Sequence, residues 1–131
     1  MLSSMQQYLD VIVPRGGKSL VKRVQKEARI PVIGHLEGIC HIYIHKTANL
    51  EMARKITLNA KMRRTGICGA AETILIDRDI SSSILNDLIN DLDDLNCEIR
   101  GDEEVQKYSE KVIATNEDDW SKEYLLSLIH I

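Results

Sequence analysis

Apolar residues along this chain alternate between short runs typical of buried strands and longer stretches with helical spacing. The short runs predict strands at residues 10–14, 31–33, 41–45, 73–77, 97–99 and 112–114. The spaced stretches predict helices at residues 18–28, 49–62, 81–95 and 103–108, with a last helix from about residue 119. Strands that alternate with helices indicate an α/β fold class with a parallel sheet.

Two of the predicted helices carry N-terminal signals. Asn49, followed by Glu51, is a favoured N-cap for the helix that runs to about Met62. The hydroxyls of residues 81–83 offer caps for the helix that runs to Leu95. The apolar stripe of that helix contains Ile84, Leu85, Leu88, Ile89, Leu92 and Leu95, and the stripe of the first helix contains Leu20, Val21, Val24 and Ala28.

Both ends of the chain look unlike the ends of a complete domain. The first strand begins almost at the first residue, and residues 125–131 are an apolar run with no stop signal. A parallel sheet needs cover on both faces, which so few elements cannot supply. We therefore expect the chain to be a fragment.

Composition narrows the class of protein and its compartment. The 131 residues are enough for one ordinary domain, and no apolar run approaches the ~20 residues needed to span a bilayer. The N-terminus lacks the blocks of a secretory signal. Three widely spaced cysteines without a CxxC pair argue against a disulfide framework or a metal site. These observations favour the cytoplasm, where thiols stay reduced.

Charge is distributed unevenly along the chain. Residues 1–66 contain 12 Lys and Arg and 4 Asp and Glu, whereas residues 67–131 contain 5 and 16. This asymmetry is typical either of an ordinary solvated surface or of a basic half that faces an anionic ligand. Nucleic acid is disfavoured as a partner because aromatics do not interleave the basic residues. A phosphorylated small molecule fits better.

The segment from Arg63 to Glu72 places Cys68 between Gly66 and Gly69. Covalent thiolate chemistry needs nearby cations, which lower the thiol pKa, and small neighbours, which let a carbonyl approach. Cysteine is more often an inert core residue. The glycines and the preceding cations, Lys61 among them, favour a nucleophile over that alternative.

Two further segments contain candidate functional groups. The turn with Arg15, Gly16, Gly17 and Lys18 precedes a helix, so it is either a phosphate cradle or an ordinary βα turn. Residues 35–41 mix imidazole, carboxylate and thiol without zinc spacing. Within them Cys40 is expected in the core, and Glu37 is either a base or a loop carboxylate.

Three stretches together resemble the gamma-glutamyl phosphate reductases, a branch of the aldehyde dehydrogenase superfamily. They are residues 10–18 (DVIVPRGGK), 35–41 (HLEGICH) and 59–73 (NAKMRRTGICGAAET). Their order and spacing follow the family's, and the last is highly specific. The likeness runs from about residue 8 to about residue 125 and covers a middle portion of the family's chain.

The resemblance implies an activity and a site. The family reduces L-glutamyl 5-phosphate to L-glutamate 5-semialdehyde with NADPH, in proline biosynthesis, through a thioester on a cysteine that matches Cys68. The resemblance places Arg15, Gly16, Gly17 and Lys18 at the NADP(H) cleft and implies no metal. The water-activating glutamate of oxidising relatives matches His35 or, with a slip of two residues, Glu37.

The resemblance also implies an aldehyde-dehydrogenase-like division of the chain. Residues 1–34 would end the cofactor-binding domain, and residues 35–131 would form part of the catalytic domain. Most cofactor contacts of the family lie outside this portion, so we expect the chain to be inactive alone. Its partners would be a small acyl phosphate substrate and a second copy or a complementing fragment, with no nucleic acid and no membrane. Two alternatives remain: a non-catalytic remnant or interaction module, and a phosphate-binding regulatory protein.

Overall fold

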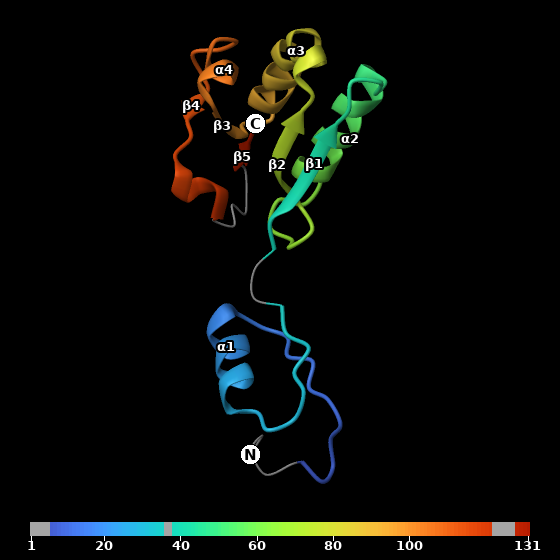
Figure 1. Ribbon diagram of the computed structural model, residues 1–131, viewed down its shortest axis with the longest axis vertical. Coiled ribbons are helices and arrows are strands. Elements are labelled where there is room, and N and C mark those ends of the chain that lie inside the picture. The colour runs from blue at the N-terminus through green and yellow to red at the C-terminus, as the bar shows by residue number, and fades with distance from the viewer. Residues whose placement is uncertain (1–5, 36–37, 122–127) are drawn as a thin grey trace. The chain divides into compact units, whose positions relative to one another are not determined.

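The computed structural model describes residues 6–35, 38–121 and 128–131. The chain divides into two compact units, residues 1–38 and 39–131 (Figure 1). The sequence-based boundary between a cofactor domain and a catalytic domain lies four residues earlier, after residue 34. The assignment of those two roles stays a prediction.

The first unit contains one helix, α1 (Lys18–Glu27), among its described residues. In place of its two predicted strands, the unit has a single parallel bridge between Ile12 and Val32. The prediction of a buried strand at residues 10–14 is therefore wrong. Val11 and Val13 are exposed, and Ile12 between them forms that bridge. Within the predicted stripe of α1, Val21 and Val24 are buried as expected, whereas Leu20 is exposed.

The second unit is built on a five-stranded sheet whose neighbouring strands are all parallel. Its strands are β1 (Cys40–Ile44), β2 (Ala71–Ile76), β3 (Glu98–Gly101), β4 (Ile113–Ala114) and β5 (Leu128–His130). They lie in the order β1-β2-β5-β3-β4, so the last strand fills the centre. This parallel sheet with intervening helices confirms the predicted α/β class.

The helix predicted from about residue 119 is not confirmed within the described residues. Residues Glu117–Ser121 form a short 3₁₀ helix, η3, and residues 128–130 are the central strand β5. β5 pairs with β2 through Thr73 and His130 and with β3 through Ile99 and Ile129. Residues 122–127 lie outside the described part.

The helices of this unit are α2 (Leu50–Met62), α3 (Ser81–Asp94) and α4 (Glu103–Gln106). The predicted cap of α2 is confirmed, because the Asn49 side-chain oxygen accepts from Met52 N at 2.9 Å. The serine cap of α3 is wrong. A 3₁₀ turn, η2 (Arg78–Ile80), leads directly into α3, and Asp77 caps that turn instead.

The core lies between the sheet and the helices α2 and α3, which run side by side (Figure 1). The stripe of α3 is buried as predicted at Ile84, Leu85, Leu88, Ile89 and Leu92. Leu95 is the exception and is exposed, because α3 ends before it. Arg54 of α2 joins the two helices through ion pairs of 2.7 Å with Asp87 and Asp91.

One face of the sheet carries exposed apolar side chains. Tyr43 of β1 and Leu75 of β2 are register partners, and they are 59% and 45% exposed. Successive side chains of a strand point to opposite faces, so Ile42 and Ile44 turn toward the core instead. The described residues therefore cover one face of this parallel sheet and leave Tyr43 and Leu75 open on the other, as expected from its few elements.

Candidate active site

The segment around Cys68 is a well-defined surface loop between α2 and β2. Two consecutive turns shape it: Ile67 N donates to Arg64 O at 3.5 Å, and Ala70 N donates to Ile67 O at 3.0 Å. Cys68 lies within the second turn and is exposed, whereas Ala70, just before β2, is buried. The fold thus holds the predicted nucleophile at the surface.

The glycines on either side of Cys68 face open space. A Cβ added at Gly66 or at Gly69 would meet no atom within 4 Å outside its chain neighbours. Neither residue has a positive φ among the described glycines, where only Gly16 does. No packing contact within the described part of the chain therefore requires glycine at these positions, and their missing side chains leave room beside the thiol.

Cys40 lies beside the nucleophile loop, which the sequence did not predict. Its thiol donates to the backbone carbonyl of Cys68 at 3.4 Å, and its side chain is half-buried rather than part of the core. β1 and β2 are parallel neighbours, and Cys40 pairs with Ala71 at their amino ends. The signal that could have found this contact was that Cys40 begins one strand and Cys68 closely precedes its neighbour.

Cys97 differs from the other two thiols in its burial. It is 4% exposed, and burial raises the pKa of its thiol from 9.0 to about 11, although Lys61 partly opposes this shift. A thiol with a raised pKa forms little thiolate near neutral pH. Cys97 is therefore a core residue with low reactivity.

The cations that precede Cys68 do not all reach the surface. Lys61 is fully buried, and its charge interacts with Cys97 and Glu72. Burial lowers the pKa of its ammonium group. Lys61 is thus part of the interior behind the loop and is not one of the exposed cations beside Cys68. Arg63 and Arg64, in contrast, are exposed at the start of the loop.

Both arginines line a cavity of about 290 Å³ at the nucleophile loop. Its other lining residues are Asn59, Ala60, Ile67 and Gly69, so it includes both neighbours of Cys68 in the chain. Sequence analysis identified the arginines but missed Asn59. That residue lies one helical turn before Arg63 on α2, a spacing that places both on one face. The cavity thus combines two guanidinium groups and an amide with the residues on either side of Cys68, although Cys68 itself is not among its lining residues.

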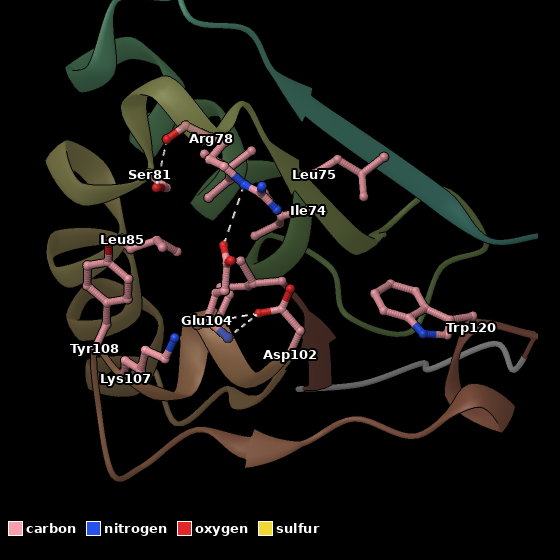
Figure 2. Close-up of a pocket in the computed structure, with 13 residues that line it drawn as sticks. Ile74, Leu75, Arg78, Ser81, Leu85, Asp102, Glu104, Lys107, Tyr108 and Trp120 are labelled. Carbon is pink, nitrogen blue, oxygen red and sulfur yellow. Dashed lines mark hydrogen bonds and ion pairs between the residues drawn. The ribbon is translucent and has the colours of Figure 1, made fainter.

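A larger cavity, of about 340 Å³, lies at the carboxyl ends of β2 and β3 (Figure 2). It contains none of the predicted site residues. Several of its charged side chains make structural contacts: Arg78 pairs with Glu104 at 3.6 Å, and Asp102 accepts from the first amides of α4. Leu75 and Trp120 close another side of it. We therefore assign the candidate site to the loop of Cys68, where an exposed thiol accompanies the cations.

The predicted phosphate cradle lies in the first unit, at the start of α1. Gly17 is the N-cap, with no side-chain hydrogen bond, and a Cβ at this position would meet nothing within 4 Å. Gly16 has a φ of 145°, a conformation that favours glycine, and the Leu20 side chain lies against it. Arg15 and Lys18 flank the pair and are exposed. The helix start is therefore open at Gly17, and its role as a phosphate cradle stays a prediction.

Two other predicted candidates are His35 and Glu37. His35 is exposed in the first unit, and Glu37 lies outside the described residues, so the match to the water-activating glutamate stays open between them. Over residues 6–35, 38–121 and 128–131, no group of three or more His, Cys, Asp or Glu side chains could hold a metal ion. No helix within these ranges has the length and apolar character needed to cross a membrane.

Comparison with known proteins gives relatives along the whole chain. It is 57% identical over 131 residues to gamma-glutamyl phosphate reductase of Brucella suis and 55% identical over 129 residues to that of Bradyrhizobium diazoefficiens. These alignments cover 100% and 98% of this chain but 31% and 30% of the relatives. The chain therefore spans about a third of the length of the proteins it matches. No protein-family model matches it.

Solved structures give the same result. The crystal structure of gamma-glutamyl phosphate reductase from Thermotoga maritima superposes with a TM-score of 0.91 at 35% identity, over 97% of this chain and 31% of that one. Betaine aldehyde dehydrogenase from Staphylococcus aureus, in complex with NAD⁺, matches with a TM-score of 0.57 at 22% identity, over 72% of this chain and 19% of that one. The second likeness concerns the fold alone. The chain is thus an aldehyde-dehydrogenase-like α/β protein, homologous over its length to about a third of a gamma-glutamyl phosphate reductase.

Proposed function

We propose that this chain provides the nucleophile of an NADPH-dependent reductase that converts L-glutamyl 5-phosphate to L-glutamate 5-semialdehyde. The observation that carries the proposal is the exposed Cys68 on a loop with open space at both glycines and two arginines beside it. The high identity to gamma-glutamyl phosphate reductases supports this substrate class. Because the chain spans about 31% of those relatives, the activity belongs to the complete protein.

The chemistry assigned to Cys68 is acyl transfer. Its thiolate attacks the carbonyl carbon of the acyl phosphate, the bond from that carbon to the phosphate oxygen breaks, and inorganic phosphate leaves. The product of this step is a thioester on Cys68. NADPH, held at the start of α1, would supply the hydride for reduction of this thioester, and Cys68 would regain its thiolate when the semialdehyde leaves. The missing side chains at Gly66 and Gly69 leave the acyl group room to approach.

The cofactor contacts that we propose lie at the start of α1. Backbone amides of a helix N-terminus, together with its dipole, favour a phosphate group. Gly16 and Gly17 let the phosphate approach the backbone, and Arg15 and Lys18 add positive charge. The fold shared with an NAD⁺-bound dehydrogenase supports a nicotinamide cofactor. The choice of NADP(H) over NAD(H) rests on the resemblance.

The setting of this reaction is part of the proposal. We infer a cytoplasmic enzyme of proline biosynthesis that acts on a small acyl phosphate and needs no metal. A second copy of the chain, or a fragment that supplies the remaining two thirds or so of the relatives' length, would complete the site. This inference agrees with the open apolar face at Tyr43 and Leu75.

Titration calorimetry of NADPH on the purified chain and on Cys68→Ala tests the cofactor contacts. We expect saturable binding that Cys68→Ala preserves and that Gly17→Glu weakens, because a carboxylate at this helix start repels phosphate. Lys22→Gln is the matched control, since it also lowers the charge by one, at an exposed position of the same helix. Equal losses in both variants would mean that charge alone attracts the cofactor, and the cradle would be rejected.

One observation favours a second candidate function, a non-catalytic interaction module. Tyr43 and Leu75 lie next to each other on an uncovered face, as the surface of a docking module would. The two candidate functions differ in whether they require a reactive thiol at Cys68. A module has no need of a reactive Cys68, so an alkylation rate equal to that of Cys40 would favour the module over the enzyme.

A further inference from the structure

The cavity beside the nucleophile loop combines features of an oxyanion site. Arg63 and Arg64 both line its wall and are exposed, and Asn59 adds an amide from the preceding turn of α2. Neither arginine has a salt bridge to a carboxylate among the ion pairs of the described residues. At about 290 Å³ the cavity has ample room for a phosphate-sized anion.

The position of these arginines has a structural explanation that needs to be weighed first. They follow the last turn of α2, where cations interact favourably with the helix dipole. That explanation accounts for positive charge at this end of the helix. It does not account for a concave wall that two cations and an amide share with both neighbours of Cys68. Planar guanidinium groups bind phosphate through paired hydrogen bonds, which suits such a wall.

The substrate of the proposed reaction has two anionic groups that such a wall could hold. Its phosphoryl group is joined through one oxygen to the carbon that Cys68 attacks, whereas its carboxylate lies at the far end of the glutamyl chain. The cavity wall includes Ile67 and Gly69, the residues bonded to Cys68. A group held there would contact the residues bonded to the nucleophile, which favours the phosphoryl group over the distant carboxylate.

We propose that Arg63 and Arg64, with Asn59, form the subsite that binds the phosphoryl group of the acyl phosphate and receives the departing phosphate. This assignment rests on the proposed function for the identity of the substrate. Positive charge there stabilises the developing negative charge on the leaving phosphate. The two arginines are then specificity-determining residues that favour an acyl phosphate over an uncharged aldehyde or ester.

Titration calorimetry with inorganic phosphate, at constant ionic strength, tests the subsite on the 131-residue chain. We expect saturable binding that the double variant Arg63→Gln with Arg64→Gln weakens at least about tenfold, because each charge-assisted hydrogen bond to phosphate is lost. Lys46→Gln is the matched control: it removes an exposed cation of the same unit, away from the cavity, and we expect it to change the affinity less than about twofold. Circular dichroism verifies that each variant is folded.

A second measurement relates the subsite to Cys68. We expect saturating phosphate to slow alkylation of Cys68 by iodoacetamide, an uncharged reagent, in the wild type and not in the double variant. Absence of phosphate binding, equal affinity in wild type and double variant, or tighter binding of L-glutamate than of phosphate would each overturn the assignment. Iodoacetamide could also fail to alkylate Cys68 selectively while phosphate binding still depends on the two arginines. That result would reject the proposed reaction and leave the anion subsite standing.

Discussion

At the scale of single residues, three thiols of the same chain have three different surroundings. Cys68 is exposed on its loop, Cys40 is half-buried and donates to the Cys68 carbonyl, and Cys97 is buried in the core. Access and thiolate formation decide how fast a cysteine reacts. The environment of Cys68 rather than its residue type therefore makes it the candidate nucleophile.

We predict that iodoacetamide alkylates Cys68 first, Cys40 more slowly and Cys97 last in the folded chain. Burial restricts access to Cys97, and its raised pKa keeps it protonated at neutral pH. Mass spectrometry of peptides from timed samples measures the three rates. In denaturant the three rates should converge, which is the control. Equal rates for Cys68 and Cys97 in the native state would contradict the prediction.

Cys97 also makes stability depend on pH. Its pKa is raised from 9.0 to about 11 in the folded chain, so the unfolded thiol loses its proton first as the pH rises. The native state then binds more protons than the unfolded state, and stability falls between pH 9 and pH 11. The loss amounts to about 3 kcal/mol at most, from two pKa units.

The comparison with Cys97→Ala isolates this effect. Lys61, whose pKa is lowered by burial, makes stability rise with pH, but it is present in both proteins. We expect the free energy of unfolding of the wild type to decline relative to that of Cys97→Ala over pH 9–11, measured by urea denaturation. Cys40→Ala, at a half-buried position, serves as the control. Parallel curves for wild type and Cys97→Ala would refute the assignment.

At the scale of the elements, α3 is the helix that the sequence predicted best. Its stripe of Ile and Leu residues packs on the sheet, and Leu88 and Leu92 have no exposed surface. An amphipathic stripe is a local property with a fixed period, which is why it can be read from the sequence. The ends of the helix were less predictable. Leu95 is exposed at its C-terminal end, and Asp77 caps the 3₁₀ turn before α3 in place of the expected serine caps.

We predict that Leu88→Ala lowers the free energy of unfolding by about 2–5 kcal/mol, since it removes a fully buried side chain and leaves a cavity. Leu95→Ala is the matched control on the same stripe. Because Leu95 is exposed, we expect a change within about 0.5 kcal/mol. Urea denaturation followed by circular dichroism measures both. A similar cost for the two variants would show that α3 extends its buried face beyond Asp94.

At the scale of the whole molecule, part of one face of the parallel sheet is uncovered among the described residues. Tyr43 and Leu75 lie exposed together on the other face, and the chain spans about 31% of its relatives. Parallel sheets in folded proteins are covered on both faces. The remainder of the complete protein, or a partner, is therefore expected over Tyr43 and Leu75.

We predict no turnover by the 131-residue chain alone in the reverse reaction, from L-glutamate 5-semialdehyde, phosphate and NADP⁺ to NADPH. The proposed nucleophile is present, but the chain corresponds to only about a third of the relatives. Absorbance of NADPH measures the rate, and faster alkylation of Cys68 than of Cys97 in a parallel sample verifies that the chain is folded. Turnover that disappears in Cys68→Ala would contradict the need for further chain.

The sequence by itself determined the α/β class, the Asn49 cap, the buried stripe of α3 and the family resemblance, because each depends on residues close together in the chain. Only the tertiary structure decided which residues meet across the fold. It brought Cys40 to the Cys68 carbonyl, buried Lys61 behind the loop and placed β5 between β2 and β3. These features depend on strand order and on packing between distant segments, and periodicity carries no information about either.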